Sequence, residues 1–249
     1  MRDAPLDWWS TYFDDDYLLE HGPMFTPERT RREVARALDI AGLPLGARIL
    51  DCPCGQGRHA TLFADAGYDV TSADYSRPLL RVAQRDAGRG TTFVRVDARE
   101  LPKRWTGRFD AVFSLGASFG FFATPAEDAA TLASYARVLG PGGVLVLHAA
   151  NRDGVVSHFI EKDWWETESG TLVLHEREFD PLSGVLTVRV QLRGRSVTKR
   201  AYRMRLYTPT TLAERCAQAG LVVTEVFDGW RDRPVRRRSG EMVLVASKH

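Results

Sequence analysis

Short apolar runs alternate with segments of helical spacing along the middle of the chain. Apolar runs bounded by polar residues are typical of buried strands, whereas apolar residues three or four positions apart are typical of helices. The predicted strands are residues 47–50, 68–73, 92–96, 109–115 and 143–149, and the predicted helices include 60–66, 79–86 and 126–139. This alternation predicts an α/β fold in which right-handed crossovers join the strands of a parallel sheet.

The pattern changes on both sides of this core. Before it, an aromatic and acidic segment precedes an amphipathic helix at residues 29–38. After it, Leu and Val alternate with Thr, Arg and Gln over residues 186–192, which is the period of a half-exposed strand. We therefore expect two or three antiparallel strands to be inserted in the α/β unit. A helix at 208–218 and strands at 222–227 and 242–246 complete the predicted elements.

Composition limits the classes of protein that fit. A formal net charge of +2 is too mild to indicate a nucleic-acid partner by itself. Cys52, Cys54 and Cys216 are odd in number and lack a paired metal spacing, which argues against a disulfide framework and favours the reduced cytoplasm. The N-terminus lacks the basic start and apolar stretch of a signal peptide, and no apolar run approaches the roughly 20 residues that span a bilayer.

Acidic side chains follow three successive predicted strands. These are Asp51, Asp74 and Asp97. Ligands of an open parallel sheet bind beyond the carboxyl ends of the strands, so three carboxylates there can contact three polar groups of one extended ligand. A single Asp at such a place is more often a helix or turn cap. The repetition favours a cofactor site.

A glycine-containing loop lies between the first predicted strand and its helix, at residues 51–60. Glycine permits positive φ and close approach of the backbone to a ligand, and Gly55-x-Gly57-x-x-Ala60 alone also fits a dinucleotide site. Asp51, however, places an anion where a pyrophosphate would sit, which suits an ammonium group instead. The sequence therefore favours a ligand other than a dinucleotide.

Residues 49–60 resemble motif I of the class I S-adenosylmethionine-dependent methyltransferases. Pro53 stands where the family has its first glycine. Asp74 is similar to the family's acid for the ribose hydroxyls, and Asp97-Ala98 is similar to its adenine-reading pair. Residues 109–115 and 139–143 resemble the fourth strand and the turn before the fifth.

The resemblance implies a seven-stranded, doubly wound Rossmann-like sheet that binds S-adenosyl-L-methionine. The domains it implies are an N-terminal helical cap (1–40), the cofactor-binding core (41–154), an antiparallel β insertion (155–207) and a C-terminal helix with the last two strands (208–249). The aromatic cap is expected either to form a lid over the cofactor or to pack on the sheet. The expected cofactor-binding residues are Asp51, Cys52, Pro53, Cys54, Gly55, Gly57, Arg58, Asp74, Tyr75, Asp97, Ala98, Ser114, Leu115 and Gly116, with Tyr12 and Tyr17 from the cap.

The candidate catalytic and acceptor-binding residues lie outside the motifs that carry the resemblance. His148 ends the fifth predicted strand and is the best-placed general base, although a buried structural histidine fits its alternation with Val144 and Val146 better, and some acceptors need no base. The expected acceptor-binding residues are Phe119, Phe122, Trp230 and Arg236. Helix packing for the two phenylalanines and a solvated charge run for the arginine are the competing interpretations. No metal is expected.

The resemblance implies in-line methyl transfer to an oxygen or nitrogen of a small metabolite, and an anionic one would suit the arginines of 231–238. No DNA or membrane partner is expected, and the insertion is expected to cover the substrate or to form a homodimer contact. Two other functions stay open. One is methylation of RNA such as tRNA, because basic residues recur in 189–200 and 231–238. The other is S-adenosylmethionine binding without catalysis.

Overall fold

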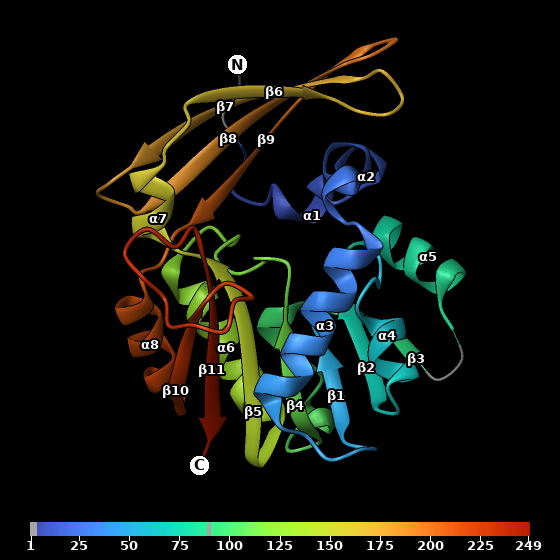
Figure 1. Ribbon diagram of the computed structural model, residues 1–249, viewed down its shortest axis with the longest axis vertical. Coiled ribbons are helices and arrows are strands. Elements are labelled where there is room, and N and C mark those ends of the chain that lie inside the picture. Colours follow the sequence, from blue (N-terminus) through green and yellow to red (C-terminus); the bar gives the residue numbers. More distant parts are fainter. Residues whose placement is uncertain (1–3, 89–90) are drawn as a thin grey trace.

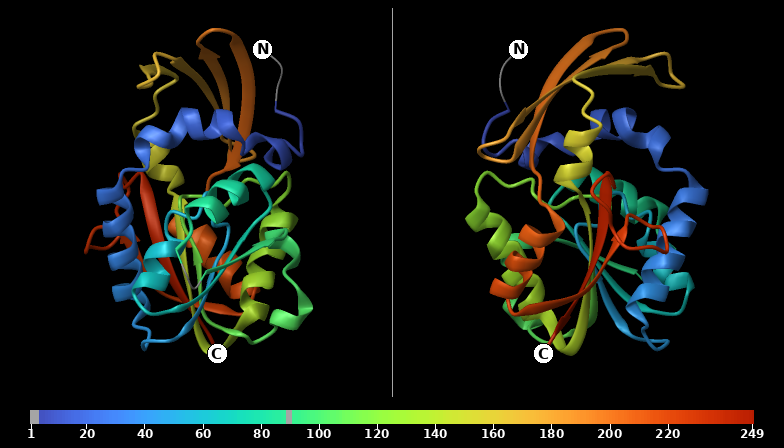
Figure 2. Two further views of the ribbon diagram at one scale, coloured as in Figure 1. Left: turned by 90° about the vertical axis from the view of Figure 1, so that its right-hand side faces the viewer. Right: turned by 60° about the vertical axis from the view of Figure 1, so that its left-hand side comes forward.

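The computed structural model describes residues 4–88 and 91–249. A seven-stranded sheet forms the body of the molecule, and a separate four-stranded sheet lies across one end of it (Figure 1). Two short N-terminal helices, α1 (Trp9–Tyr12) and α2 (Asp15–His21), lie between the two sheets (Figure 2). No helix of the described ranges is both long enough and apolar enough to cross a membrane.

The seven-stranded sheet has the order β3-β2-β1-β4-β5-β11-β10. Neighbouring strands from β3 to β5 are parallel, and β11 runs antiparallel to both β5 and β10. This order confirms the predicted Rossmann-like sheet. Its strands are β1 (Arg48–Asp51), β2 (Asp69–Asp74), β3 (Thr91–Arg95), β4 (Phe109–Ser114), β5 (Leu139–Ala150), β10 (Leu221–Asp228) and β11 (Glu241–Lys248).

Helices cover both faces of this sheet. Val34 and Phe63, from α3 and α4, pack with Ile49 on one face, whereas Leu132 and Leu212, from α6 and α8, pack on the other. Four of the helices begin with a Thr or Ser cap and a proline in the first turn, a combination that fixes a helix start. The helices that flank the sheet are α3 (Pro27–Ala41), α4 (Ala60–Asp65), α5 (Arg77–Asp86), α6 (Pro125–Val138) and α8 (Pro209–Gln218). Shorter ones are α7 (Arg152–Ser157) and the 3₁₀ helices Gly22–Met24, Ala98–Glu100 and Lys103–Trp105.

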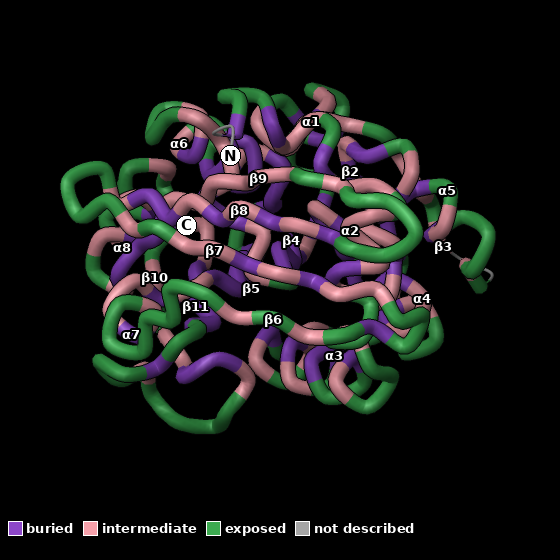
Figure 3. Tube along the Cα trace, turned by 90° about the horizontal axis from the view of Figure 1, so that it is seen from above, coloured by how far each residue is buried: buried purple, intermediate pink, exposed green. Residues whose placement is uncertain are grey.

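The insertion is a four-stranded antiparallel sheet rather than the two or three strands expected. Its order is β6-β7-β8-β9, and the strands run side by side across the top of the molecule (Figure 3). The alternation predicted for 186–192 is confirmed in β8, whose leucines and valines are buried. The strand that was missed, β6, has little apolar alternation and is held by pairing with β7. The strands are β6 (Lys162–Glu166), β7 (Leu172–Asp180), β8 (Val185–Arg193) and β9 (Val197–Arg205).

The N-terminal helices are fixed to the second sheet by charged contacts. Arg200 on β9 lies 2.8 Å from Oδ1 of Asp14 and also donates to the carbonyl oxygen of Tyr12. The guanidinium of Arg200 lies 4.0 Å from the centre of the Tyr12 ring. These helices and the second sheet thus form one roof over the carboxyl ends of the parallel strands.

Candidate active site

A cavity opens where the carboxyl ends of β1, β2 and β4 meet the roof. It encloses about 820 Å³, open solvent at its mouth included. The core lines it with Cys52, Pro53, Gly55, Asp74, Tyr75, Ser76, Leu79, Val96, Asp97, Ala98, Ser114, Thr131 and Tyr135. The cap adds Trp9, Phe13 and Tyr17, and the loop after β4 adds Ser118, Phe119, Gly120, Phe121 and Phe122.

The loop after β1 runs along the floor of the cavity. Gly55 and Gly57 have φ of +57° and +77°, a region that L side chains rarely adopt. A Cβ on Gly57 would lie 2.9 Å from the Cβ of Ala83, so this glycine also allows the loop to pack on α5. The Cys52–Pro53 peptide bond is cis, and Pro53 lines the cavity.

Asp74 is held firmly in the cavity wall by backbone donors. Its Oδ2 accepts from the Gly55 N–H and its Oδ1 from the Ser76 N–H, both at 2.8 Å. Burial raises the pKa of this carboxyl, and the backbone hydrogen bonds oppose the shift. Because an ionised carboxylate has about four acceptor positions, Asp74 can accept further hydrogen bonds from a ligand.

Asp51 presents a buried carboxyl group without a partner. It is fully buried at the end of β1, directly before Cys52 in the cavity wall. Neither carboxyl oxygen has a hydrogen-bond partner in the described part of the chain. Burial raises the pKa of Asp51 to about 8, although the charge of Arg58 works in the opposite direction. An unpaired buried carboxylate is costly, so a cationic ligand group there would be strongly stabilised.

Aromatic rings close the cavity from above. Trp9 of α1, Phe13 between the two helices and Tyr17 of α2 all line the cavity. The ring of Trp9 lies 4.9 Å from that of Tyr75 and 5.1 Å from that of Phe122. The sequence placed Trp9 and Phe13 in the aromatic cap that was expected as a lid, but only Tyr12 and Tyr17 of that cap were expected to bind the cofactor.

The structure brings most of the expected core residues together and leaves several outside the described lining. Of the expected cofactor residues, Asp51, Cys54, Gly57, Arg58, Leu115, Gly116 and Tyr12 are outside it. Arg58 is 2.5 Å from Oε2 of the buried Glu33, and the Tyr12 hydroxyl donates to Glu20. The side chain of Cys54 is buried and Gly57 packs on α5, so these two residues stabilise the loop without lining the cavity.

His148, Trp230 and Arg236 also lie outside this lining. His148 is fully buried 3.2 Å from the carboxylate of Glu241, and its ring centroid lies 5.1 Å from that of Trp230. The loop between β10 and β11 does sit at the carboxyl edge, but Asp228 binds Arg231 and Arg233 and folds the loop back on itself. The geometry therefore gives no contact between these three residues and a ligand in the cavity.

No group of three or more His, Cys, Asp or Glu side chains in the described ranges is arranged to hold a metal ion. The cysteine thiols of the floor are buried, and burial raises their pKa, so they are held as thiols. The polar groups of the cavity are thus carboxyl, hydroxyl and backbone groups.

Comparison with known proteins identifies the cofactor-binding part of the chain. Residues 49–143 match the family model described as a methyltransferase domain. They contain the three acids that follow strands, and the sheet order is that of the class I fold. This chain has a class I methyltransferase domain.

The methyltransferase domain has both sequence and structural relatives. Glycine/sarcosine N-methyltransferase of Halorhodospira halochloris is 34% identical over 160 residues, 63% of this chain and 55% of that protein. The CcbJ methyltransferase of Streptomyces caelestis matches with a TM-score of 0.79 at 20% identity over 96% of this chain and 98% of that one. S-adenosylmethionine-bound CalS10, an amino pentose methyltransferase of Micromonospora echinaspora, matches with a TM-score of 0.66 at 24% identity over 89% of this chain and 94% of that one.

The solved structures and the curated relatives are matched over different shares of their own length. The solved structures share the fold of this chain over 96% and 89% of its length. In contrast, the chain spans about half the length of the curated relatives it matches.

Proposed function

We propose that the protein transfers the methyl group of S-adenosylmethionine to a nitrogen or oxygen of a small molecule. The observation that carries this proposal is the buried, unpartnered carboxyl of Asp51 beside a cavity that Asp74 and Asp97 line. Asp51 is buried directly before Cys52 of the lining, and an ammonium group that reached it would satisfy its carboxyl. A dinucleotide pyrophosphate would instead bring negative charge to a buried acid.

The residues of the cavity fit the parts of this cofactor. Asp51 suits the ammonium group of its methionyl part, and Asp74 has acceptor capacity left for the two ribose hydroxyls. Asp97 and Ala98 line the part of the cavity at the end of β3, where the family resemblance places the adenine. The flat rings of Tyr75 and Trp9 border the same cavity and suit an aromatic base.

When bound, S-adenosylmethionine supplies an electrophilic methyl group on a sulfonium sulfur. The chain's own contribution is then to align the acceptor and exclude water. Trp9, Phe13 and Tyr17 cover the cavity, and Phe119, Phe121 and Phe122 line it from the loop after β4. We do not assign proton removal to His148, because its ring is buried against Glu241 and Trp230.

The enclosure of the site supports a small acceptor. The roof of cap and second sheet covers the carboxyl edge of the parallel strands (Figure 2). The names of two relatives, a glycine/sarcosine N-methyltransferase and an amino pentose methyltransferase, favour an amine nitrogen. An anionic acceptor has no support from Arg236, which is outside the described cavity lining.

RNA methylation is the less favoured alternative. Its basic patch would need arginines that are free to bind phosphate. Arg200 pairs with Asp14, Arg189 with Glu178, and Arg231 and Arg233 with Asp228. These contacts engage four of the ten basic residues of 189–200 and 231–238 within the protein.

Calorimetry with S-adenosylmethionine, S-adenosylhomocysteine and NAD tests the proposal. We expect heat of binding with the two sulfur compounds and none with NAD. Asp74→Ala should weaken binding at least about tenfold, since a hydrogen bond to a charged group contributes about 1.5–3 kcal/mol. Asp69→Ala is the matched control, because Asp69 is exposed at the opposite end of β2.

Two results would contradict the proposal. Tight NAD binding without binding of either sulfur compound would show that the cavity serves another cofactor. Equal affinities for Asp74→Ala and Asp69→Ala would show that the cofactor does not contact the end of β2.

A further inference from the structure

One arginine side chain, Arg99, contacts four segments around one side of the cavity. Arg99 follows β3 in the 3₁₀ helix Ala98–Glu100. It contacts Asp97 beside it, Glu127 on α6, and the rings of Trp9 in the cap and Phe122 in the loop after β4. Asp97, Trp9 and Phe122 each line the cavity, whereas Arg99 stands behind them.

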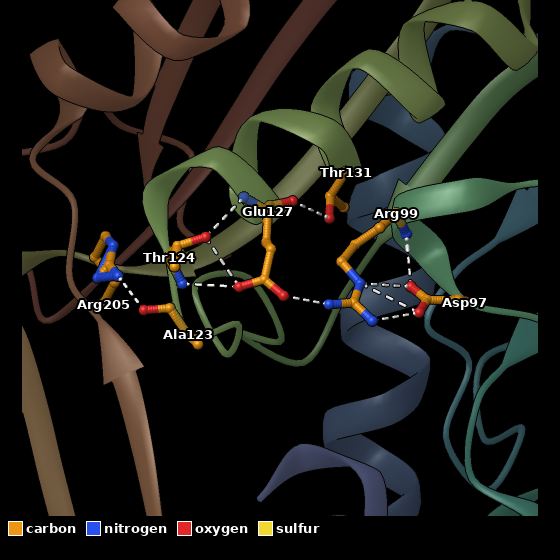
Figure 4. Close-up of polar contacts among 7 residues, drawn as sticks. All are labelled: Asp97, Arg99, Ala123, Thr124, Glu127, Thr131 and Arg205. Atoms are coloured by element: carbon orange, nitrogen blue, oxygen red, sulfur yellow. Dashed lines mark hydrogen bonds and ion pairs between the residues drawn. The ribbon is translucent and has the colours of Figure 1, made fainter. Parts of the chain in front are cut away.

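The contact with Asp97 is a two-pronged ion pair. Nε of Arg99 lies 3.0 Å from Oδ1 of Asp97, and Nη2 lies 2.6 Å from Oδ2 (Figure 4). The backbone N–H of Arg99 also donates to Oδ1 at 2.9 Å. Two parallel bonds of this kind fix the plane of a carboxylate as well as its position. Arg99 therefore sets the orientation of an acid in the cavity wall.

The contact with Glu127 extends this link to the loop that carries Phe122. Nη1 of Arg99 donates to Oε1 of Glu127, while Oε2 of Glu127 accepts from the backbone N–H of Thr124 at 2.9 Å (Figure 4). Thr124 and Glu127 form the capping box that starts α6. On the other side of this loop, Arg205 of β9 donates to the carbonyl oxygen of Ala123. The loop is thus held from the core by Arg99 and from the second sheet by Arg205.

The remaining contacts join Arg99 to the cap. Its guanidinium carbon lies 4.6 Å from the centre of the Trp9 ring and 4.5 Å from that of the Phe122 ring. A planar guanidinium over an aromatic face is attracted by the ring's quadrupole, and a lysine ammonium does not reproduce both this stacking and the two-pronged pair. The ring of Trp9 therefore packs against a guanidinium group that the core holds in place.

We propose that Arg99 is a positioning residue that fastens the N-terminal cap over the end of the cavity at Asp97. This inference rests on the proposed function, because that end is where the adenine of the cofactor would lie. Arg99 does not line the cavity; it acts by holding Asp97 in the wall and Trp9 above it. Without Arg99 the cap stays attached to the second sheet but loses its contact with the core at Trp9, so the cofactor both binds more weakly and leaves faster.

Three variants test the proposal: Arg99→Gln, Arg99→Lys and, as control, Arg104→Gln. Arg104 is exposed and also lies over a tryptophan ring, that of Trp105 at 5.9 Å, but it contacts neither the cap nor the cavity. The first measurement is hydrogen exchange of backbone amides 8–21 in the ligand-free protein. The second is the Kd for S-adenosylhomocysteine by calorimetry.

We expect Arg99→Gln to speed exchange in the cap and to raise the Kd about tenfold, as loss of a partly buried cation–π contact and an ion pair implies. Arg99→Lys should restore cap exchange and the Kd only in part. Lysine keeps the positive charge but does not reproduce both the two-pronged pair and the stacking on the rings. Arg104→Gln should match the wild type in both measurements. Trp9→Leu and Arg99→Gln combined should change the free energy of binding by less than the sum of the two single changes, because both break the contact between Arg99 and Trp9.

Cap exchange and Kd that stay at wild-type values in Arg99→Gln would overturn the proposal. Full recovery by Arg99→Lys would also overturn it, because charge alone would then explain the effect. A wild-type protein that fails to bind S-adenosylhomocysteine contradicts the proposed function instead. In that event the exchange measurement, which needs no ligand, still decides whether Arg99 fastens the cap.

Discussion

Nε2 of His175 lies 2.9 Å from Oε1 of Glu20, and this contact joins α2 to β7 across 155 residues of sequence. Nη2 of Arg177 donates to Nδ1 of the same ring at 2.9 Å, so the ring proton lies on Nε2 and Nε2 donates to Glu20. Burial would raise the pKa of Glu20, but the hydrogen bonds from His175 and Tyr12 and the neighbouring charges outweigh it and lower the pKa. The cap is therefore attached to the second sheet by an ionised, fully buried carboxylate.

Glu20→Ala should lower the free energy of unfolding by about 3 kcal/mol, because it leaves the Tyr12 hydroxyl and His175 without a buried acceptor. Urea unfolding followed by circular dichroism measures this change. Glu28→Ala is the control: its side chain is 78% exposed and its pair with Arg31 is on the surface, so a loss below about 1 kcal/mol is expected. Similar losses in both variants would show that Glu20 does not attach the cap.

His59 should make the protein less stable as the pH falls from about 6.5 to about 4. Burial lowers the pKa of His59 to about 4, against the opposing effect of its hydrogen bond to Glu33. Between these pH values the unfolded chain binds a proton that the folded chain does not, so stability is full above pH 6.5 and is lost on acidification.

Urea midpoints measured from pH 7 to pH 4.5 test this dependence. His59→Gln removes the titrating group, so its midpoint should fall less steeply over that range than the wild-type midpoint. Parallel curves for the two proteins would assign the acid sensitivity to other groups.

Asp51 should link cofactor binding to proton release. Its carboxyl has a pKa of about 8 through burial, so it is mostly protonated at pH 7 and must ionise to pair with an ammonium group. Affinity for S-adenosylhomocysteine should therefore rise by up to about tenfold between pH 6 and pH 7. Calorimetry in buffers of different ionisation enthalpy measures the released proton. An Asp51→Asn variant with the same proton release as the wild type would exclude this residue as its source.

Gly120→Ala should disrupt the contact between the cavity loop and the second sheet. A Cβ on Gly120, which has φ of +95°, would lie 2.3 Å from the carbonyl oxygen of Arg205. Gly107 has φ of +66° with nothing within 4 Å, so Gly107→Ala introduces only the backbone strain, about 1–2 kcal/mol. Thermal unfolding should show a clearly larger loss for Gly120→Ala, and equal losses would mean that the loop shifts without cost.

The parallel core was predictable because its physical causes are local. Buried parallel strands appear as continuous apolar runs, and acids at their ends mark the ligand edge, so β1, β2 and β4 and the places of Asp51, Asp74 and Asp97 followed from the pattern. β6 was missed because its structure depends on pairing with β7 rather than on its own sequence.

The side-chain directions in the site were harder to predict than its strands. Trp230 and Arg236 were expected at the cavity because their loop was placed at the correct edge, but Asp228 binds two arginines and turns the loop away. In the cap, Tyr12 was expected to face the cofactor, yet its hydroxyl is bound by Glu20, and Trp9 faces the cavity instead. Both outcomes depend on partners distant in sequence, which no local pattern contains.

The cap and the second sheet are in contact but far apart in sequence, and this has a consequence for synthesis on the ribosome. At about 5–20 residues per second, roughly 8–30 seconds pass between the translation of Glu20 and that of His175, 155 residues later. Throughout that time the aromatic cap has been made but lacks the strands on which it packs. Trp8 and Tyr12, both buried beside Tyr202 in the finished protein, are then open to chaperones and to other nascent chains. The segment that covers the cavity is thus translated well before the strands on which it packs.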